Sequence, residues 1–270
     1  MAGAQISFVH SPWPLCEVMM TSYDDAAPDY PGTHGTGFFV TFCGALYLLT
    51  ARHCMGKLGD DIAERAARLL IPASAVPAGQ KVTVADYVRF SRIGRAVATE
   101  RLDEFLGDNE GDLGIVALEV ADDCPPDVLA EVRARSVVLP PTGEWLEKSL
   151  RHFANDGQEP VFRMRGYPQE GTETQFEYGD QRIVMQAVEQ MGQHIGPGRY
   201  LHTRQLRVFD NSPVNDHNGM SGSPVRMRVS GPSEERYALV GMVLGGRFPN
   251  VFCAGVEWLT AVVQSTMADV

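Results

Sequence analysis

The feature that most constrains the fold of this chain is a series of short apolar or β-branched segments, each bounded by Gly, Pro, Asn or Asp. Such segments are typical of strands in an all-β barrel or sandwich. At 270 residues and 44% apolar composition, the chain can bury a large core, and its length would fit two packed barrels. The predicted strands span residues 36–41, 45–51, 81–90, 113–120, 161–164, 182–190, 199–208, 225–229, 237–244 and 251–256.

Helical spacing of apolar residues occurs in a few places. It predicts short helices over residues 60–70, 127–138 and 143–153, and a C-terminal helix that contains Trp258, Leu259, Val262 and Val263. We therefore predict one domain over residues 1–270. Its first barrel covers about 1–125, its linker and helices about 126–155, and its second barrel with the C-terminal helix about 156–270.

Ser221 is the strongest candidate for a nucleophile. It lies in Asn218-Gly-Met-Ser-Gly-Ser-Pro224, and a serine nucleophile needs a neighbouring base. Residues 222–270 contain no histidine, so the base must come from upstream. His53 has the most suitable surroundings, because it directly follows the predicted strand 45–51. Taken alone, a histidine at a strand end is more often structural than catalytic.

Asp112 is the candidate for the third member of a triad, because it directly precedes the apolar segment 113–118. Asp103 and Asp108 are nearby, but neither directly precedes an apolar strand. The resulting order of His, Asp and Ser excludes the α/β-hydrolase order for Ser221, in which serine comes first and histidine last. In such a triad the serine attacks a carbonyl, the histidine accepts and returns its proton, and the aspartate orients the imidazole. The backbone amides of Gly219 and Ser221 are the predicted oxyanion donors.

Four segments occur in an order that characterises one family. They are residues 35–40, 50–54, 112–118 and 219–224, the last followed by 239–246. Over about 35–255 the chain thus resembles the trypsin-like (chymotrypsin-fold) serine peptidases. The resemblance implies two packed antiparallel β-barrels, a C-terminal helix on the second barrel, serine endopeptidase activity on protein or peptide substrates, and no cofactor.

Two positions depart from that family. Met220 stands where zymogen-activated members have an aspartate, and Ser223 replaces a common glycine. The resemblance is therefore closer to bacterial intracellular or stress-type members, which loops or partners often control. A regulatory protein partner is expected on this ground.

The resemblance also implies a substrate-binding region. Its expected residues are Asn215, Asp216, Leu244, Gly245, Gly246 and Gly255. Asp216 at the base of a pocket would favour a basic or polar substrate side chain, but it could equally point to solvent. Residues 244–246 could pair with a substrate backbone as an added strand.

Charge and cysteine content limit the other functions. The net charge of -11 disfavours nucleic acid and anionic membranes as partners, and no segment reaches the ~20 apolar residues of a membrane span. Residues 1–20 do not resemble a secretory signal, and five cysteines form no pairing pattern, so we expect a cytoplasmic protein. His194, His202 and His217 match no ligand spacing, and no metal is expected.

Two other functions remain open at this stage. One is a catalytically silent binding module on the same fold, and the other is an esterase or other acyl hydrolase with the same mechanism.

Overall fold

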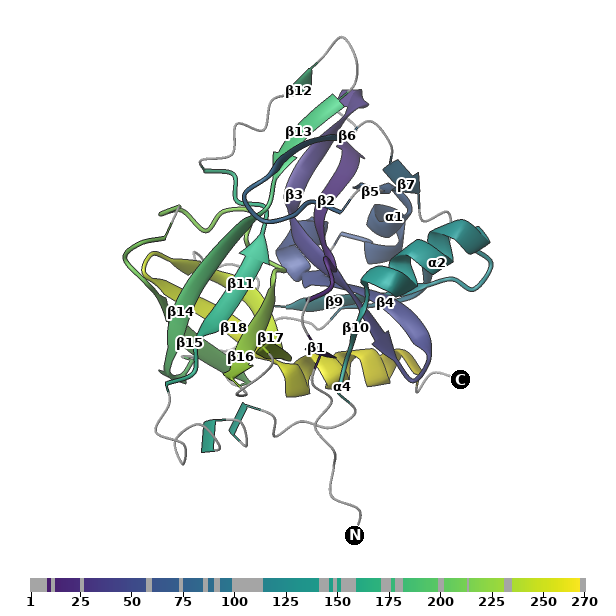
Figure 1. Cartoon of the computed structure of the whole chain (residues 1–270). Coiled ribbons are helices and arrows are strands. Elements are labelled where there is room, and N and C mark those ends of the chain that lie inside the picture. The colour runs from purple at the N-terminus through teal and green to yellow at the C-terminus, as the bar shows by residue number, and fades with distance from the viewer. Residues whose placement is uncertain are drawn as a thin grey trace.

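The computed structural model of the chain describes residues 9–10, 13–24, 27–56, 60–72, 75–84, 87–89, 93–98, 114–140, 146–147, 150–151, 159–170, 176–177, 182–198, 202–212, 214–230 and 235–267. Mostly antiparallel strands form two large sheets that lie side by side, one in the purple and blue colours of the first half and one in green and yellow, and a smaller third sheet (Figure 1). The predicted all-β class is confirmed, as are the C-terminal helix and a closed antiparallel barrel.

The closed barrel belongs to the second half of the chain. Six strands pair in the ring β17-β16-β11-β14-β15-β18, and the pairing of β17 with β18 closes it. The strands of the ring are β11 (Phe162–Gly166), β14 (Val188–Pro197), β15 (Thr203–Val208), β16 (Pro224–Ser230), β17 (Glu235–Arg247) and β18 (Asn250–Gly255). Alternate residues such as Phe162, Met164 and Leu206 point inward and fill the barrel with one apolar cluster.

The first half forms most of an eight-stranded sheet, in which seven antiparallel strands follow the order β7-β5-β2-β3-β4-β9-β8 and a short eighth strand pairs with β3. Its strands are β2 (Glu17–Asp24), β3 (Ala27–Phe42), β4 (Ala45–Ala51), β5 (Leu69–Pro72), β7 (Tyr87–Arg89), β8 (Ile93–Ala98) and β9 (Ile115–Val120). In the described part of the chain its outer strands β7 and β8 do not pair, so here the sheet is not a closed ring.

Several short strands cross between the halves. β1 (Val9–His10) pairs with β17 of the barrel, although it lies at the N-terminus. β6 (Lys81–Val84) pairs with β13 (Arg182–Gln186), which also pairs with β12 (Phe176–Glu177). β10 (Val137–Val138) runs parallel to β3. The strands β12, β13 and β6 thus form a third, three-stranded sheet that joins strands from both halves of the sequence, and the barrel sheet gains β1 from the N-terminal part.

The helices are few and short. Those with described bounds are the 3-10 turn η1 (Arg52–Met55), α1 (Ile62–Ala67), α2 (Pro126–Arg135) and α4 (Val256–Met267). In Figure 1, α4 lies along the base of both halves, and its buried residues join one cluster with β3, β4 and β9 of the first sheet and with β17 of the barrel. The helix thus packs on both halves, not on the second barrel alone. No helix within the described ranges is both long and apolar enough to cross a membrane.

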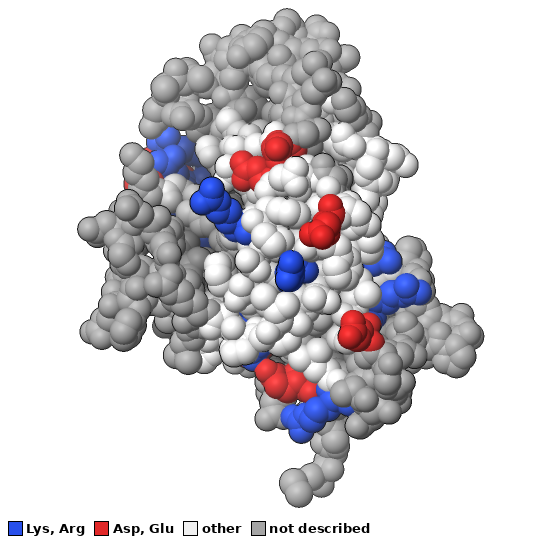
Figure 2. All heavy atoms as spheres, turned by 90° about the vertical axis from the view of Figure 1, so that its left-hand side faces the viewer, with Lys and Arg blue, Asp and Glu red and all other residues white. Residues whose placement is uncertain are grey.

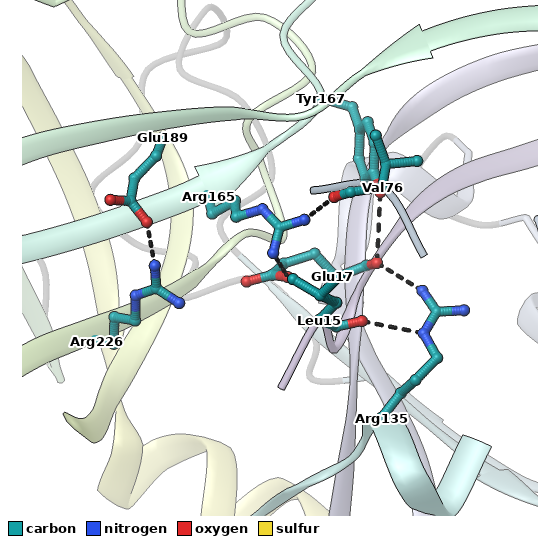
Figure 3. Close-up of polar contacts among 8 residues, drawn as sticks. All are labelled: Leu15, Glu17, Val76, Arg135, Arg165, Tyr167, Glu189 and Arg226. Atoms are coloured by element: carbon teal, nitrogen blue, oxygen red, sulfur yellow. Dashed lines mark hydrogen bonds and ion pairs between the residues drawn. The ribbon is translucent and has the colours of Figure 1, made fainter. Parts of the chain in front are cut away.

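A buried ion pair joins the two halves (Figure 3). The Glu17 carboxylate on β2 lies 3.0 Å from the Arg165 guanidinium on β11, with both side chains almost fully excluded from solvent. Arg135, at the end of α2, donates to the Glu17 carbonyl over 3.0 Å. Burial raises the pKa of Glu17, whereas the charge of Arg165 opposes that shift. This contact fixes the end of β11 against the first sheet.

Some sequence predictions differ from the structure. The helix predicted over 60–70 ends at Ala67, and Leu69 and Leu70 belong to strand β5 instead. The helix predicted over 127–138 ends at Arg135, before β10. Of the helix predicted over 143–153, residues 146–147 and 150–151 are helical and the others lie outside the described residues. Strand β2 was not predicted.

Candidate active site

His53 lies at the point where strand β4 ends. Ala51 is the last residue of β4 and pairs with Ile115, and the chain then turns through η1. The Arg52 amide donates to the Gly114 carbonyl over 2.8 Å, which fixes the start of this turn. Arg52 and Cys54 are buried on either side, whereas the His53 side chain is exposed. The backbone therefore presents this imidazole to solvent from a rigid strand end.

Asp112 lies outside the described residues, as do Asp103 and Asp108. The described chain resumes at Gly114, whose carbonyl accepts the Arg52 amide next to His53. Gly114 follows Asp112 by two positions in the sequence and lies beside the histidine segment. The assignment of Asp112 stays a prediction.

Ser221 lies in the loop between β15 and β16, and it is 8% exposed. Its carbonyl accepts the Thr36 amide over 2.9 Å and lies 3.5 Å from the Cys54 sulfur. Because Cys54 directly follows His53, the serine loop and the histidine segment are neighbours in space. The Ser221 hydroxyl donates to the Leu244 carbonyl over 3.4 Å, so a rotation about its Cα–Cβ bond is needed before it can donate to an imidazole.

The peptide groups of the Ser221 loop are held one by one. All five carbonyls from His217 to Ser221 accept hydrogen bonds, and the donors in chain order are the Met220 amide (2.9 Å), the Gln169 amide (2.8 Å), the Thr36 hydroxyl (2.7 Å), the Ser223 amide (3.0 Å) and the Thr36 amide (2.9 Å). The loop therefore has little freedom to rotate any of these peptide planes.

Of the four backbone amides from Gly219 to Gly222, two donate to carbonyls of the described chain and two do not. The Met220 and Gly222 amides donate to the carbonyls of His217 and Val243. The Gly219 and Ser221 amides have no acceptor among the residues that the structure describes. An amide with no internal acceptor is available to an oxygen of a ligand. These are the two amides that the sequence predicted as oxyanion donors.

Gly219 is required by its backbone conformation and by its neighbours. Its φ of 87° lies in the left-handed region that favours glycine. A Cβ at this position would overlap the carbonyl oxygen of Tyr167, at the end of β11. The loop therefore approaches β11 more closely than any other residue at position 219 would permit.

Asn215 and Asp216 are both exposed. Their backbone amides donate to the Glu170 carboxylate. The Asp216 carboxylate accepts from the Asn218 amide over 3.0 Å and from its side-chain nitrogen over 2.7 Å. Of the two alternatives for Asp216, the structure shows the surface position. This carboxylate shapes the loop before Ser221 and does not form the base of a buried pocket.

Residues 244–246 lie beside Ser221. Leu244 is buried at a bulge in β17, with its carbonyl over the Ser221 hydroxyl. Gly245 and Gly246 pair with β18, and within the described part of the chain no strand covers their other edge, because β16 pairs with β17 only up to Met242. This edge is available for an extended peptide.

The expected place of Gly255 is wrong. Gly246 pairs with Val251, whereas Gly255 pairs with Gly241. Because a strand rises by about 3.3 Å per residue, Gly255 is more than about 10 Å along β18 from the residue opposite Gly246. It is buried, and its amide donates to the His202 carbonyl over 3.0 Å. Gly255 therefore does not lie across from Gly246, where it was expected.

Cys54 is not a second nucleophile. All five cysteines are free thiols, and only Cys43 is exposed. Burial raises the pKa of Cys54 to about 12, so this side chain stays protonated at neutral pH. It is a buried residue of η1 whose thiol faces the Ser221 carbonyl at 3.5 Å.

The structure also reveals site features that the sequence did not. The Thr36 hydroxyl and the Leu244 carbonyl contact the loop from distant parts of the chain. A small hollow beside Gly219 is lined by Met19, Tyr167, Gln169 and Met185, among others. Ser22 and His34 form a serine–histidine contact of 2.7 Å, with Ser22 buried. No sequence motif marks these groups.

Comparison with known proteins adds no family. No protein-family model matches the sequence, and no curated protein matches it. Figure 2 shows that on one face of the molecule the described acidic and basic side chains are interspersed, with no patch of a single sign.

Proposed function

We propose that this protein is a serine endopeptidase of the trypsin-like type, with Ser221 as nucleophile and His53 as general base. The observation that carries the proposal is the pair of amides at Gly219 and Ser221. Neither has an acceptor among the described residues, although all five carbonyls from His217 to Ser221 accept a hydrogen bond. Such a pair can stabilise the negative oxygen of a tetrahedral intermediate.

In the proposed reaction the Ser221 hydroxyl attacks the carbonyl carbon of a peptide bond, and its proton passes to His53. The carbonyl oxygen becomes an oxyanion that accepts from the Gly219 and Ser221 amides. His53 then gives the proton to the leaving amine, which leaves an ester on Ser221. Water, deprotonated by His53, attacks that ester, and His53 then returns the proton to the Ser221 oxygen as the acid product leaves. Asp112 is proposed to hold the imidazole in the required tautomer.

The substrate backbone is proposed to lie along residues 244–246 as an added antiparallel strand. Support comes from the free edge of β17 at this point and from the closeness of Leu244 to the Ser221 hydroxyl. A preference for basic substrate side chains is not part of the proposal, because Asp216 is exposed and its carboxylate binds Asn218.

The experiment that tests the proposal is cleavage of a peptide library, read by mass spectrometry, with matched amino-acid esters assayed in parallel. The proposal expects peptide cleavage by the wild type and none by Ser221→Ala. Ester turnover without peptide cleavage would support the acyl-hydrolase alternative. Failure on both substrate classes would support the silent binding module. The cytoplasmic location and the regulatory partner stay predictions.

A further inference from the structure

Thr36 has an unusual set of contacts for a residue in the middle of a strand. It lies in β3 of the first sheet and is fully buried. Its amide donates to the Ser221 carbonyl over 2.9 Å. Its hydroxyl donates to the Gly219 carbonyl over 2.7 Å and accepts the Tyr167 amide over 3.0 Å. One residue of the first half therefore binds the second half at three points.

Thr36 binds the carbonyls of Gly219 and Ser221, the two residues whose amides are available. A trans peptide holds its carbonyl and its N–H on opposite sides, so fixing a carbonyl also fixes the direction of the amide after it. The Asn218 carbonyl, which precedes the Gly219 amide, is held by the Gln169 amide. Gln169 lies two residues after Tyr167, whose amide binds the Thr36 hydroxyl. Thr36 thus holds Gly219 directly and also holds the segment that orients its amide.

The other groups that could hold this loop do not replace Thr36. Met220 is buried in the apolar cluster of the barrel and offers no charge. The Ser223 hydroxyl is buried without a hydrogen-bond partner in the described residues. The Thr36 carbonyl is itself held, because the Thr50 hydroxyl donates to it over 2.7 Å. The loop is therefore held by a neutral hydroxyl from the opposite sheet.

From these contacts we infer that Thr36 is a positioning residue of the oxyanion site, and that its hydroxyl keeps the Gly219 amide directed at the substrate. The inference rests on the proposed peptidase function and deepens it. Thr36 does not touch the substrate. It makes the catalytic geometry depend on the packing of the first sheet against the barrel.

The test compares Thr36→Val with Thr36→Ser. Valine keeps the shape but removes the hydroxyl, which leaves the Gly219 carbonyl and the Tyr167 amide unpaired. Because loss of one oxyanion donor costs about 10²–10³ in kcat, and Thr36 acts only through that donor, we expect Thr36→Val to lower kcat by about 10–10³-fold with little change in KM. Serine restores the donor, so Thr36→Ser should keep kcat within about fivefold of the wild type.

The matched control is Thr260→Val. Thr260 is also buried, and its hydroxyl donates to the Pro140 carbonyl over 2.8 Å, but it lies on α4. This variant should lose stability like Thr36→Val and keep its kcat. If Thr36→Val does not fold, Thr36→Cys, whose thiol is only a weak donor, carries the same expectation of lowered kcat at constant KM.

Two results would overturn the inference while leaving the proposed function standing. One is a folded Thr36→Val variant with wild-type kcat, and the other is a loss of kcat that Thr36→Ser does not restore. A wild type that cleaves neither peptides nor esters would instead overturn the proposed function, and the inference with it.

Discussion

Gly219→Ala is the substitution for which the structure makes the sharpest prediction. Gly219 has a φ of 87°, where an alanine costs about 1–2 kcal/mol of backbone strain. The new Cβ would also overlap the Tyr167 carbonyl oxygen, so the loop must move away from β11. That movement turns the Gly219 amide away from the position of the oxyanion.

The expected loss can be compared with known losses of a single oxyanion donor. Removing one donor lowers kcat by about 10²–10³-fold, which corresponds to about 2.7–4 kcal/mol of transition-state stabilisation. We therefore expect Gly219→Ala to lower kcat by about this factor with a small change in KM. The assay is steady-state cleavage of the best peptide from the library, together with the free energy of unfolding from urea denaturation.

Gly44→Ala is the matched control. Gly44 has the same φ of 87°, but no atom lies within 4 Å of the position its Cβ would take. It should lose about 1–2 kcal/mol of stability and keep wild-type kcat. A folded Gly219→Ala variant with wild-type kcat would refute the claim that this amide takes part in catalysis.

Three further predictions concern charged and titrating groups. Arg165→Met should destabilise the fold by about 3–5 kcal/mol in urea denaturation, because it leaves the Glu17 carboxylate buried without its partner. Adding Glu17→Leu should recover most of that loss of stability. A double variant that is as unstable as Arg165→Met would contradict this explanation. Burial lowers the pKa of His217, so the stability contributed by its neutral form should be lost as the pH falls from the ordinary value near 6.5 through the folded-state pKa. His217→Leu should therefore show a smaller decrease in melting temperature between pH 8 and pH 5 than the wild type, and an equal decrease would show that His217 is not responsible. Asp216→Ala should change the stability of the Ser221 loop without changing the preference for the substrate side chain. A selective loss of cleavage after basic residues would show that Asp216 lines the substrate pocket.

Most of the fold could be predicted from local sequence patterns. Strand β4 was predicted with its full bounds, because its apolar residues and flanking glycine define it without tertiary information. Strand β2 was not recognised, because it begins with Glu17, whose burial makes sense only with Arg165 from the other half of the chain. Leu69 and Leu70 fit a helical period, yet pairing with β2 and β7 places them in a strand.

The site residues also fall into those that local sequence could predict and those that depend on distant contacts. The Ser221 loop and the position of His53 at a strand end followed from adjacent residues. Thr36 could not be found in this way, since its role depends on contacts with residues 131 and 183 positions away. The error at Gly255 came from strand register, because the bulge at Leu244 and the pairing of β17 with β18 fix its place in the barrel.

The central claim is that Ser221 is a nucleophile activated by His53, and the most direct measurement is the rate and the site of fluorophosphonate labelling. The account predicts a single adduct on Ser221 in the wild type, none in Ser221→Ala, and a rate lowered by about 10³-fold or more in His53→Ala but not in His34→Ala. No adduct, an adduct on Ser22, or an unchanged rate in His53→Ala would contradict it.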